Sequence, residues 1–223
     1  MTDHLRIALA QLNPVVGDIE GNMEMLIHSR KEAAQKGVEL LVASELSITG
    51  YPPEDLVLRR AFISKVEEAV LHLAAKTGDS GPGLLIGAPW RDDGKLHNAA
   101  LLLDEGKVMA RRYKHELPNY GVFDEQRIFE AGPLAGPVSF RGVRLGVMLC
   151  EDMWFEDVSE TLAESGAQIL IVLNGSPYEK DKDDVRLNLA VSRVMETGLP
   201  LIYVNQVGGQ DELVFDGGSF VLD

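Results

Sequence analysis

The stretch LGVMLCEDMW (residues 145–154) decides the fold class, because an apolar run gives way there to polar residues at a single point. Val143, Leu145, Val147 and Leu149 alternate as the residues of a β-strand do, and Cys150 follows directly. Mixed α/β folds often carry reactive side chains at such a point, since the sheet fixes the backbone and the next loop opens to substrate. We therefore predict a buried strand that ends at a candidate functional cysteine.

Strand patterns and helix patterns alternate on both sides of this stretch. Short buried strands are expected within residues 5–12, 40–42, 169–173 and 201–204. Three segments between them place apolar residues at helical spacing, and these are Met23, Leu26, Ile27, Ala33 and Ala34; Phe62, Val66, Ala69, Val70, Leu73 and Ala74; and Leu187, Ala190, Val191, Val194 and Met195. Each set is predicted to form one apolar helix face.

The middle of the chain predicts antiparallel pairing. Residues 84–86, 96–103 and 107–113 are strand-like and follow one another without a helix. Asp104-Glu105-Gly106 joins the last two and is a good tight-turn sequence. Residues 215–223 are expected to form a final strand that stops with the chain. We predict one mixed α/β domain over residues 1–223, with both sheet faces covered and the last strands of the fold missing.

Composition excludes several classes of protein. The 223 residues carry 21 positive and 35 negative charges, so the net charge of −14 disfavours nucleic acid and anionic lipid as partners. No apolar run is long enough to span a bilayer, and the N-terminus lacks the pattern of a secretory signal, so a cytoplasmic location is expected. Cys150 is the only cysteine and the five histidines show no ligand spacing, which disfavours a disulfide or a metal site.

Three residues at predicted strand ends are candidates for catalysis. Cys150 is a potential nucleophile, although an isolated cysteine is more often a small buried apolar residue. Glu45, at the end of LLVASE, is a general base if burial raises its pKa, and otherwise a surface charge or a helix cap. Lys114 would stabilise an oxyanion, or it is one of many solvated cations. Such a set needs no histidine.

Two further motifs are weaker. TGYPPED (residues 49–55) is a loop followed by a helix start. GGQDELVFDGGS (residues 208–219) is rich in glycine, as phosphate-binding loops are, but its acidic residues argue against phosphate. It matches neither the Walker pattern nor the dinucleotide fingerprint.

Taken together, these segments resemble the nitrilase, or carbon–nitrogen hydrolase, superfamily. Glu45 lies in SELSITGYPPEDL, Lys114 in YKHELPNYGVFDEQRIF and Cys150 in LGVMLCEDMW, and this order of Glu, Lys and Cys after strands is the catalytic signature of that superfamily. The phrases ITGYPPEDL, LPNYGVFDE, CEDMW, NGSPY and YVNQVGGQDELVFDGGS narrow the resemblance to the glutaminase domain of glutamine-dependent NAD synthetases. The resemblance runs from about Ile7 to the end of the chain.

This resemblance implies a four-layer α-β-β-α sandwich that associates into homo-oligomers. It also implies a mechanism in which Glu45 takes the proton of Cys150, the thiolate attacks the side-chain amide of glutamine, and Lys114 holds the oxyanion together with backbone N–H near Glu151. Ammonia leaves and water cleaves the thioester to give glutamate.

The resemblance also assigns a glutamine pocket. Serine and a cation suit the α-carboxylate of glutamine, and Glu151 suits its α-ammonium. The pocket residues are Tyr120, Glu151, Trp154, Ser176 and Lys182. Tyr51 and Glu125 are expected in support, with Glu125 orienting Lys114 unless it is a surface acid beside Asp124.

In one respect the sequence departs from the family. Glutamine-dependent NAD synthetases carry an ATP-using domain with an SGGxDS phosphate loop, and this motif is absent here. ATP and Mg²⁺ are therefore expected only for a synthetase domain or subunit that acts as a partner, and the amidase reaction is expected to need no cofactor. Two alternatives stay open: another superfamily enzyme that cleaves a different ω-amide, a carbamoyl compound or a nitrile, and a silent module that docks on a synthetase. A third interpretation, a redox-sensing thiol protein, rests on Cys150 alone and leaves Glu45 and Lys114 unexplained.

Overall fold

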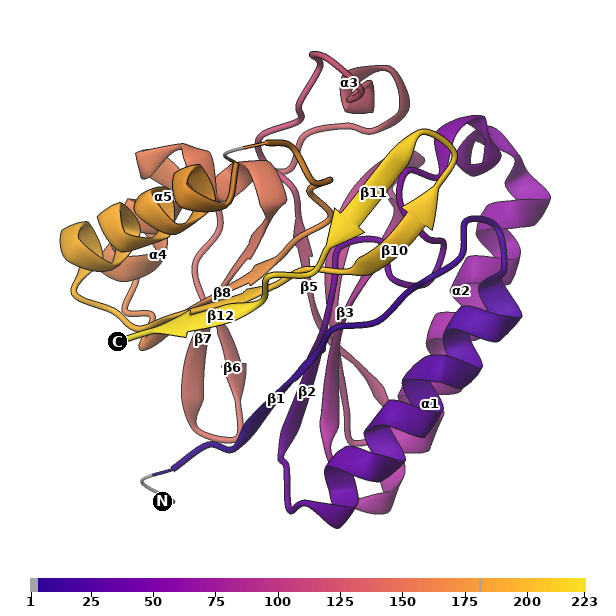
Figure 1. Cartoon of the computed structure of the whole chain (residues 1–223). Coiled ribbons are helices and arrows are strands. Elements are labelled where there is room, and N and C mark those ends of the chain that lie inside the picture. The colour runs from indigo at the N-terminus through magenta and orange to yellow at the C-terminus, as the bar shows by residue number, and fades with distance from the viewer. Residues whose placement is uncertain (1–3, 181) are drawn as a thin grey trace.

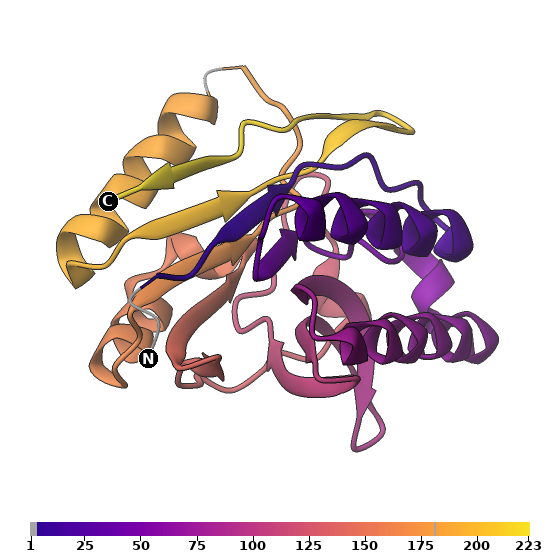
Figure 2. The same cartoon turned by 90° about the horizontal axis from the view of Figure 1, so that it is seen from below.

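The structure, a computed structural model, describes residues 4–180 and 182–223, without the side chains of residues 182 and 183. Two five-stranded sheets face each other, and helices cover the outer face of each (Figures 1 and 2). The four-layer α-β-β-α sandwich implied by the resemblance is therefore confirmed. Within the described residues, no helix has the length and apolar character needed to cross a membrane.

The first sheet has the order β1-β2-β3-β4-β5. β1, β2 and β3 are parallel, whereas β4 and β5 form an antiparallel meander with β3. Its strands are β1 (Ile7–Ala10), β2 (Leu40–Ala43), β3 (Gly83–Asp92), β4 (Lys95–Asp104) and β5 (Lys107–Tyr113). The predicted turn at Asp104-Glu105-Gly106 joins β4 to β5, and the antiparallel pairing predicted there is confirmed.

The second sheet has the order β12-β9-β8-β7-β6. β7, β8 and β9 are parallel, and antiparallel strands flank them on both sides. The strands are β6 (Val138–Phe140), β7 (Val143–Leu149), β8 (Ile169–Leu173), β9 (Leu201–Val204) and β12 (Phe220–Leu222). A separate hairpin of β10 (Val207–Gln210) and β11 (Leu213–Asp216) lies beside the segment that links β1 to α1 (Figure 1).

Helices connect the parallel strands and cover the sheets. α1 (Ile19–Gln35) and α2 (Arg60–Lys76) pack on the first sheet, and α4 (Glu156–Glu164) and α5 (Lys182–Thr197) pack on the second. Shorter pieces are α3 (Glu125–Ile128) and the 3₁₀ turns η1 (Glu54–Leu58), η2 (Thr77–Asp79) and η3 (Cys150–Trp154). Asp18 caps α1 by accepting a hydrogen bond from the Gly21 N–H.

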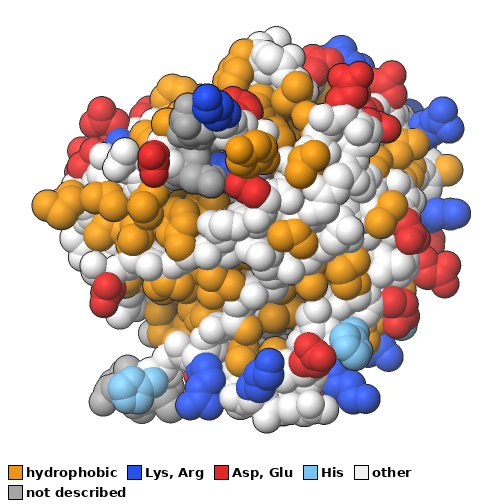
Figure 3. Space-filling model, viewed as in Figure 1, with side chains coloured by type: hydrophobic (Ala, Val, Ile, Leu, Met, Phe, Trp, Pro, Cys, Tyr) orange, Lys and Arg blue, Asp and Glu red, His pale blue; other side chains and the backbone are white. Residues whose placement is uncertain are grey.

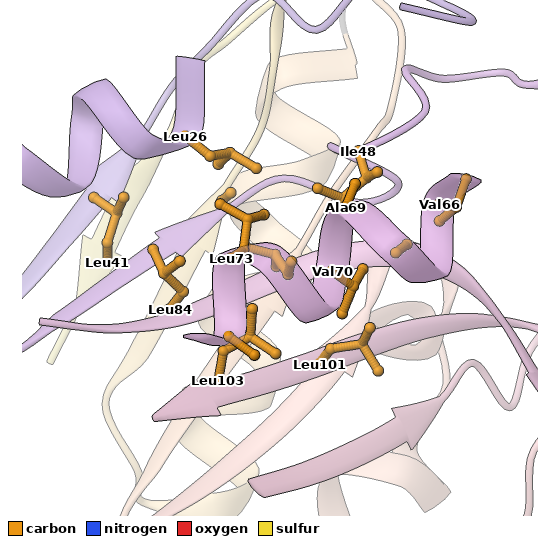
Figure 4. Packing of buried hydrophobic residues seen from close by; sticks show 14 of the residues in the cluster. Leu26, Leu41, Ile48, Val66, Ala69, Val70, Leu73, Leu84, Leu101 and Leu103 are labelled. Atoms are coloured by element: carbon orange, nitrogen blue, oxygen red, sulfur yellow. The ribbon is translucent and has the colours of Figure 1, made fainter. Parts of the chain in front are cut away.

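Burial on both faces explains why central strands such as β2 and β8 are apolar throughout. On β2, Leu40 and Val42 face the second sheet, whereas Leu41 faces α1 and α2. Figure 4 shows the outer side of this sheet, where Leu41, Leu84, Leu101 and Leu103 meet helix residues such as Leu26, Val66, Val70 and Leu73. Both faces of each sheet are thus buried, as the sequence predicted.

The prediction of the buried face of α5 was wrong in part. Ala190 is fully buried and Val194 packs on the core, but Leu187, Val191 and Met195 are exposed, with Met195 78% accessible. Exposed apolar side chains gather over this helix in Figure 3. The helix sequence carries two apolar stripes, and only one of them faces the sheet. Arg186 and Arg193 are also buried on the helix, and they pair with Asp216 and Glu196.

The C-terminal strand was also predicted incorrectly. Residues 215–223 were expected to form one strand, but Gly217 and Gly218 adopt positive φ angles of 74° and 62° and break it. This region of left-handed backbone suits glycine, so the chain leaves the β10–β11 hairpin and joins the second sheet as β12. The glycine-rich segment 208–219 is accordingly a hairpin and a strand connection.

Candidate active site

The three predicted catalytic residues follow three strand ends. Glu45 lies just beyond β2, Lys114 directly after β5 and Cys150 directly after β7. β2 and β5 run in the same direction, because β3 is parallel to β2 and β4 is antiparallel to both β3 and β5. The first sheet therefore supplies Glu45 and Lys114 at the C-terminal ends of two strands that run in the same direction. The second sheet supplies Cys150, which is close enough for both charges to affect its pKa.

Lys114 is fully buried between two carboxylates. Its Nζ donates to Glu45 Oε1 at 2.7 Å and to Glu125 Oε1 at 2.8 Å. Burial lowers the pKa of the ammonium, but Glu125 and Glu45 outweigh burial and hold the pKa well above its usual value. An ammonium has three N–H donors, so one remains for a further oxygen. Lys114 is therefore a charged donor and not a base.

Glu45 is fully buried, and only one of its two carboxylate oxygens accepts hydrogen bonds from the described residues. Oε1 accepts from Lys114 and from Asn98 Nδ2, the latter at 2.8 Å. Oε2 has no hydrogen-bond partner among the described residues. Burial, only partly offset by Lys114, raises the pKa of Glu45 to about 7. A buried carboxylate with a free oxygen and a pKa near neutrality has the properties of a general base.

Cys150 occupies the first position of η3, with a left-handed φ of 43°. The residue is 4% exposed. Burial is the largest cause that raises the pKa of its thiol well above the usual value, and the Glu45 carboxylate adds to it. The resting side chain is thus a thiol, and it needs a base to become the nucleophilic thiolate.

The predicted supporting residues lie beside this group. Glu125 is buried at the start of α3 and bonded to Lys114, so it is not a surface acid. The hydroxyl of Tyr51 donates to Glu125 Oε1 at 2.9 Å. Asn98 was missed: its Nδ2 donates to Glu45 Oε1 and, at 3.2 Å, to Glu125 Oε2. The only sequence signal was a polar residue inside the apolar strand LHNAALLL.

Part of the predicted glutamine pocket comes together. Tyr120, in the loop before α3, donates its hydroxyl to the Glu151 carboxylate, at 2.9 Å from Oε1 and 3.0 Å from Oε2. Glu151 and the half-buried Trp154 both lie on η3, the turn that begins with Cys150. Tyr120 and Glu151 are therefore held at the turn that begins with Cys150.

Ser176 follows β8, and Lys182 is the first residue of α5. Ser176 is buried, and Arg186 Nη2 approaches its carbonyl oxygen at 3.2 Å and its hydroxyl at 3.4 Å. Arg186 also donates to Asp216, at 3.0 Å from each carboxylate oxygen. Arg186 was not predicted as a site residue, because the sequence shows it only as one polar position of a helix. The side chain of Lys182 lies outside the described residues.

Gly175 leaves room for the Glu45 side chain. A Cβ at this position would lie 3.0 Å from Glu45 Oε2 and 3.2 Å from the Tyr51 ring. We expect Gly175→Ala to lower kcat about tenfold and stability by about 1–3 kcal/mol, because the buried carboxylate must shift. Steady-state ammonia release checks this. Gly136→Ala, whose Cβ makes only an ordinary 3.4 Å contact, is the matched control. Unchanged kcat in Gly175→Ala would contradict the expectation.

Comparisons with known proteins identify the family of the chain. The sequence profile described as "Carbon-nitrogen hydrolase" matches residues 6–223. The glutamine-dependent NAD(+) synthetase of Rhodobacter capsulatus is 47% identical over 223 residues, which is all of this chain and 40% of the relative. That of Thermotoga maritima is 39% identical over 98% of this chain and 38% of its own length. The chain thus spans about 40% of these curated relatives.

Solved structures show the same fold. The glutamine-dependent NAD⁺ synthetase of Acinetobacter baumannii matches with a TM-score of 0.92 and 36% identity, over 97% of this chain and 41% of that one. A mutant amidase from Nesterenkonia sp. AN1, which carries the acetamide moiety of fluoroacetamide on its active-site cysteine, matches with a TM-score of 0.87 and 30% identity, over 98% and 82%. From the family profile and these matches, the chain belongs to the carbon–nitrogen hydrolase family.

Proposed function

We propose that this chain is the glutaminase domain, over residues 1–223, of a glutamine-dependent NAD synthetase. The observation that carries the proposal is the buried group of Glu45, Lys114 and Cys150, in which a carboxylate with a free oxygen, a charged donor and a thiol meet. The relatives named glutamine-dependent NAD(+) synthetase, at up to 47% identity, support glutamine as substrate.

In the proposed reaction, Glu45 Oε2 takes the proton of Cys150 as Sγ attacks the side-chain carbonyl carbon of glutamine. The third N–H of Lys114 stabilises the developing oxyanion. The tetrahedral intermediate collapses to a thioester as the amide nitrogen takes the proton from Glu45 and leaves as ammonia. Water, deprotonated by Glu45, then cleaves the thioester to give glutamate and the thiol, which regains its proton.

Tyr51 and Glu125 keep Lys114 charged and in place in this reaction. Glu151 would pair with the α-ammonium of glutamine. The hydroxyl of Tyr120 would hold the Glu151 carboxylate in place through its hydrogen bond. Ser176 and Lys182 would face the α-carboxylate, and Trp154 would line the pocket. Arg186 holds the Ser176 loop through its bonds to the carbonyl oxygens of Ser176 and Pro177.

The ammonia would serve a synthetase domain that uses ATP and Mg²⁺ to amidate deamido-NAD. The amidase step itself uses only the side chains above, and a cytoplasmic reaction is part of the proposal. We also propose self-association, which is supported by the exposed apolar residues Leu187, Val191 and Met195 of α5.

A second candidate is hydrolysis of simple amides. The match to the Nesterenkonia sp. AN1 amidase, which covers 82% of that chain, favours it. Kinetics with glutamine and with butyramide separate the two. A kcat/KM for glutamine about 100-fold higher or more is expected if Glu151 and Ser176 recognise the amino-acid end. Equal or better use of butyramide would move the assignment to a simple amidase.

The proposed role of Glu45 sets the acid limb of the pH profile. The base must be unprotonated to accept the thiol proton, and burial raises the pKa of Glu45 to about 7. Activity should therefore fall as pH drops through about 7, by roughly tenfold per unit well below it. Measuring kcat/KM for glutamine between about pH 5.5 and 8.5 checks this. A flat profile across this range would exclude Glu45 as the base.

A further inference from the structure

Asp152 joins the backbone segments that flank Cys150 and Lys114. Its Oδ2 accepts from the N–H of Leu149, the residue before Cys150, at 3.0 Å. Its Oδ1 accepts from the N–H of His115 at 3.0 Å and of Glu116 at 2.9 Å, in the two residues after Lys114. One side chain thus spans the nucleophile's turn on the second sheet and the lysine's loop on the first.

Only a carboxylate meets this demand. Three N–H donors converge on Asp152, and a carboxylate is an acceptor at both oxygens, whereas an amide or a hydroxyl brings a donor of its own. The residue is 3% exposed, and water does not replace a lost bond readily at such a site. Burial raises the pKa of Asp152 to about 6, against the lowering effect of the three N–H groups, so the side chain is charged at neutral pH.

The turn that Asp152 holds is one that the backbone does not favour. Cys150 has a left-handed φ of 43°, which costs a non-glycine residue roughly 1 kcal/mol or more. The bond from Leu149 to Asp152 closes this turn on its inner side. The bonds from residues 115 and 116 set where the turn stands relative to Lys114.

We propose that Asp152 is a positioning residue. It fixes the position of the turn that carries the proposed nucleophile, Cys150, relative to the proposed oxyanion-binding lysine, Lys114, on the other sheet. The inference rests on the proposed function only for its kinetic readout. Asp152 contacts neither reacting atom, so it acts through Cys150 and Lys114. A misplacement of about 1 Å in such a group can cost about 100-fold in rate.

Two variants test the proposal. Asp152→Asn keeps the shape but has a single acceptor oxygen, so one of the two sides loses its bond. Asp152→Ser is too short to bond both sides at once. For glutamine hydrolysis, well below each variant's unfolding midpoint, we expect kcat to fall about 100-fold in Asp152→Asn while KM changes by less than about threefold. A residue that only stabilises the fold would leave kcat per folded molecule unchanged.

A second readout does not need a substrate. Cys150 is the only cysteine, so alkylation by iodoacetamide, followed by intact mass, reports its reactivity alone. We expect the rate to fall about tenfold or more in both variants, because the base and the lysine are no longer aligned with the thiol. Asp104→Asn is the matched control. Asp104 is also a buried aspartate that accepts a hydrogen bond, here from Arg141, and it is the last residue of β4.

The outcomes separate this inference from the proposed function. If the wild-type chain hydrolyses no amide, the function fails, and the alkylation rates still decide the role of Asp152. If wild type is active and both variants keep kcat and alkylation rate within about threefold, the positioning role is overturned. Should Asp152→Asn not fold, Asp152→Ser decides, and loss of the fold in both variants would assign Asp152 to stability and overturn the proposal.

Discussion

Cys150→Ala is expected to abolish glutamine hydrolysis and to leave the domain folded. The proposed thioester forms on Sγ, and the chain has no second thiol to replace it. Removing the nucleophile of a catalytic group that acts as a unit typically costs about 10⁴-fold or more in kcat. The stability change should be small, about 1 kcal/mol or a Tm shift of about 2–4 °C, because only one sulfur atom leaves the buried site.

Ammonia release and thermal unfolding measure these two effects together. Cys150→Ser is the companion variant, since it keeps a polar atom at the same place and should also be strongly impaired, as a hydroxyl is much less acidic than a thiol. Ammonia release above about 1% of the wild-type rate in Cys150→Ala would rule out the proposed nucleophile.

Lys114→Met should lower stability more than the other variants and should also lower activity. Removing the ammonium leaves the carboxylates of Glu45 and Glu125 buried without their cation, and breaking a buried ion pair from one side costs about 3–5 kcal/mol. The change also removes the proposed oxyanion donor. It raises the pKa of Glu45 further, because Lys114 is the main group that lowers it, so the base is protonated at neutral pH.

Urea unfolding and ammonia release test this expectation. The double variant Lys114→Met/Glu125→Gln removes one of the two stranded charges, so it should regain part of the lost stability and none of the activity. Lys65→Met, at an exposed lysine of α2, is the control and should change neither. A stability of Lys114→Met within about 1 kcal/mol of wild type would show that the buried ion pairs do not hold this site together.

Much of this fold could be predicted because its pattern is local. Short windows of sequence show the alternating strand and helix segments and the turn at Asp104-Glu105-Gly106. They also show that Glu45, Lys114 and Cys150 each follow a strand. The resemblance supplied the four layers, which no window contains. The two sheets bury a shared core whose partners are far apart in the chain, such as Leu40 and Ile171.

What the sequence did not predict depends on distant partners. Asn98 looks like a misplaced polar residue until Glu45 and Glu125 come to it across 53 and 27 residues. The burial of Arg186 could not be predicted from the helix pattern, because its partner, Asp216, lies 30 residues away in the sequence. The inner face of α5 was misjudged for the same reason, since periodicity identifies apolar stripes and not which stripe meets the sheet.

The most direct test of the proposed reaction is intact-mass spectrometry after treatment with a diazo-ketone analogue of glutamine, with and without glutamine as competitor. A single adduct on Cys150 that glutamine suppresses is the expected result, and it would identify both the nucleophile and the substrate class. A folded sample that forms no adduct, or one whose labelling glutamine does not slow, would contradict the assignment of this chain as a glutaminase.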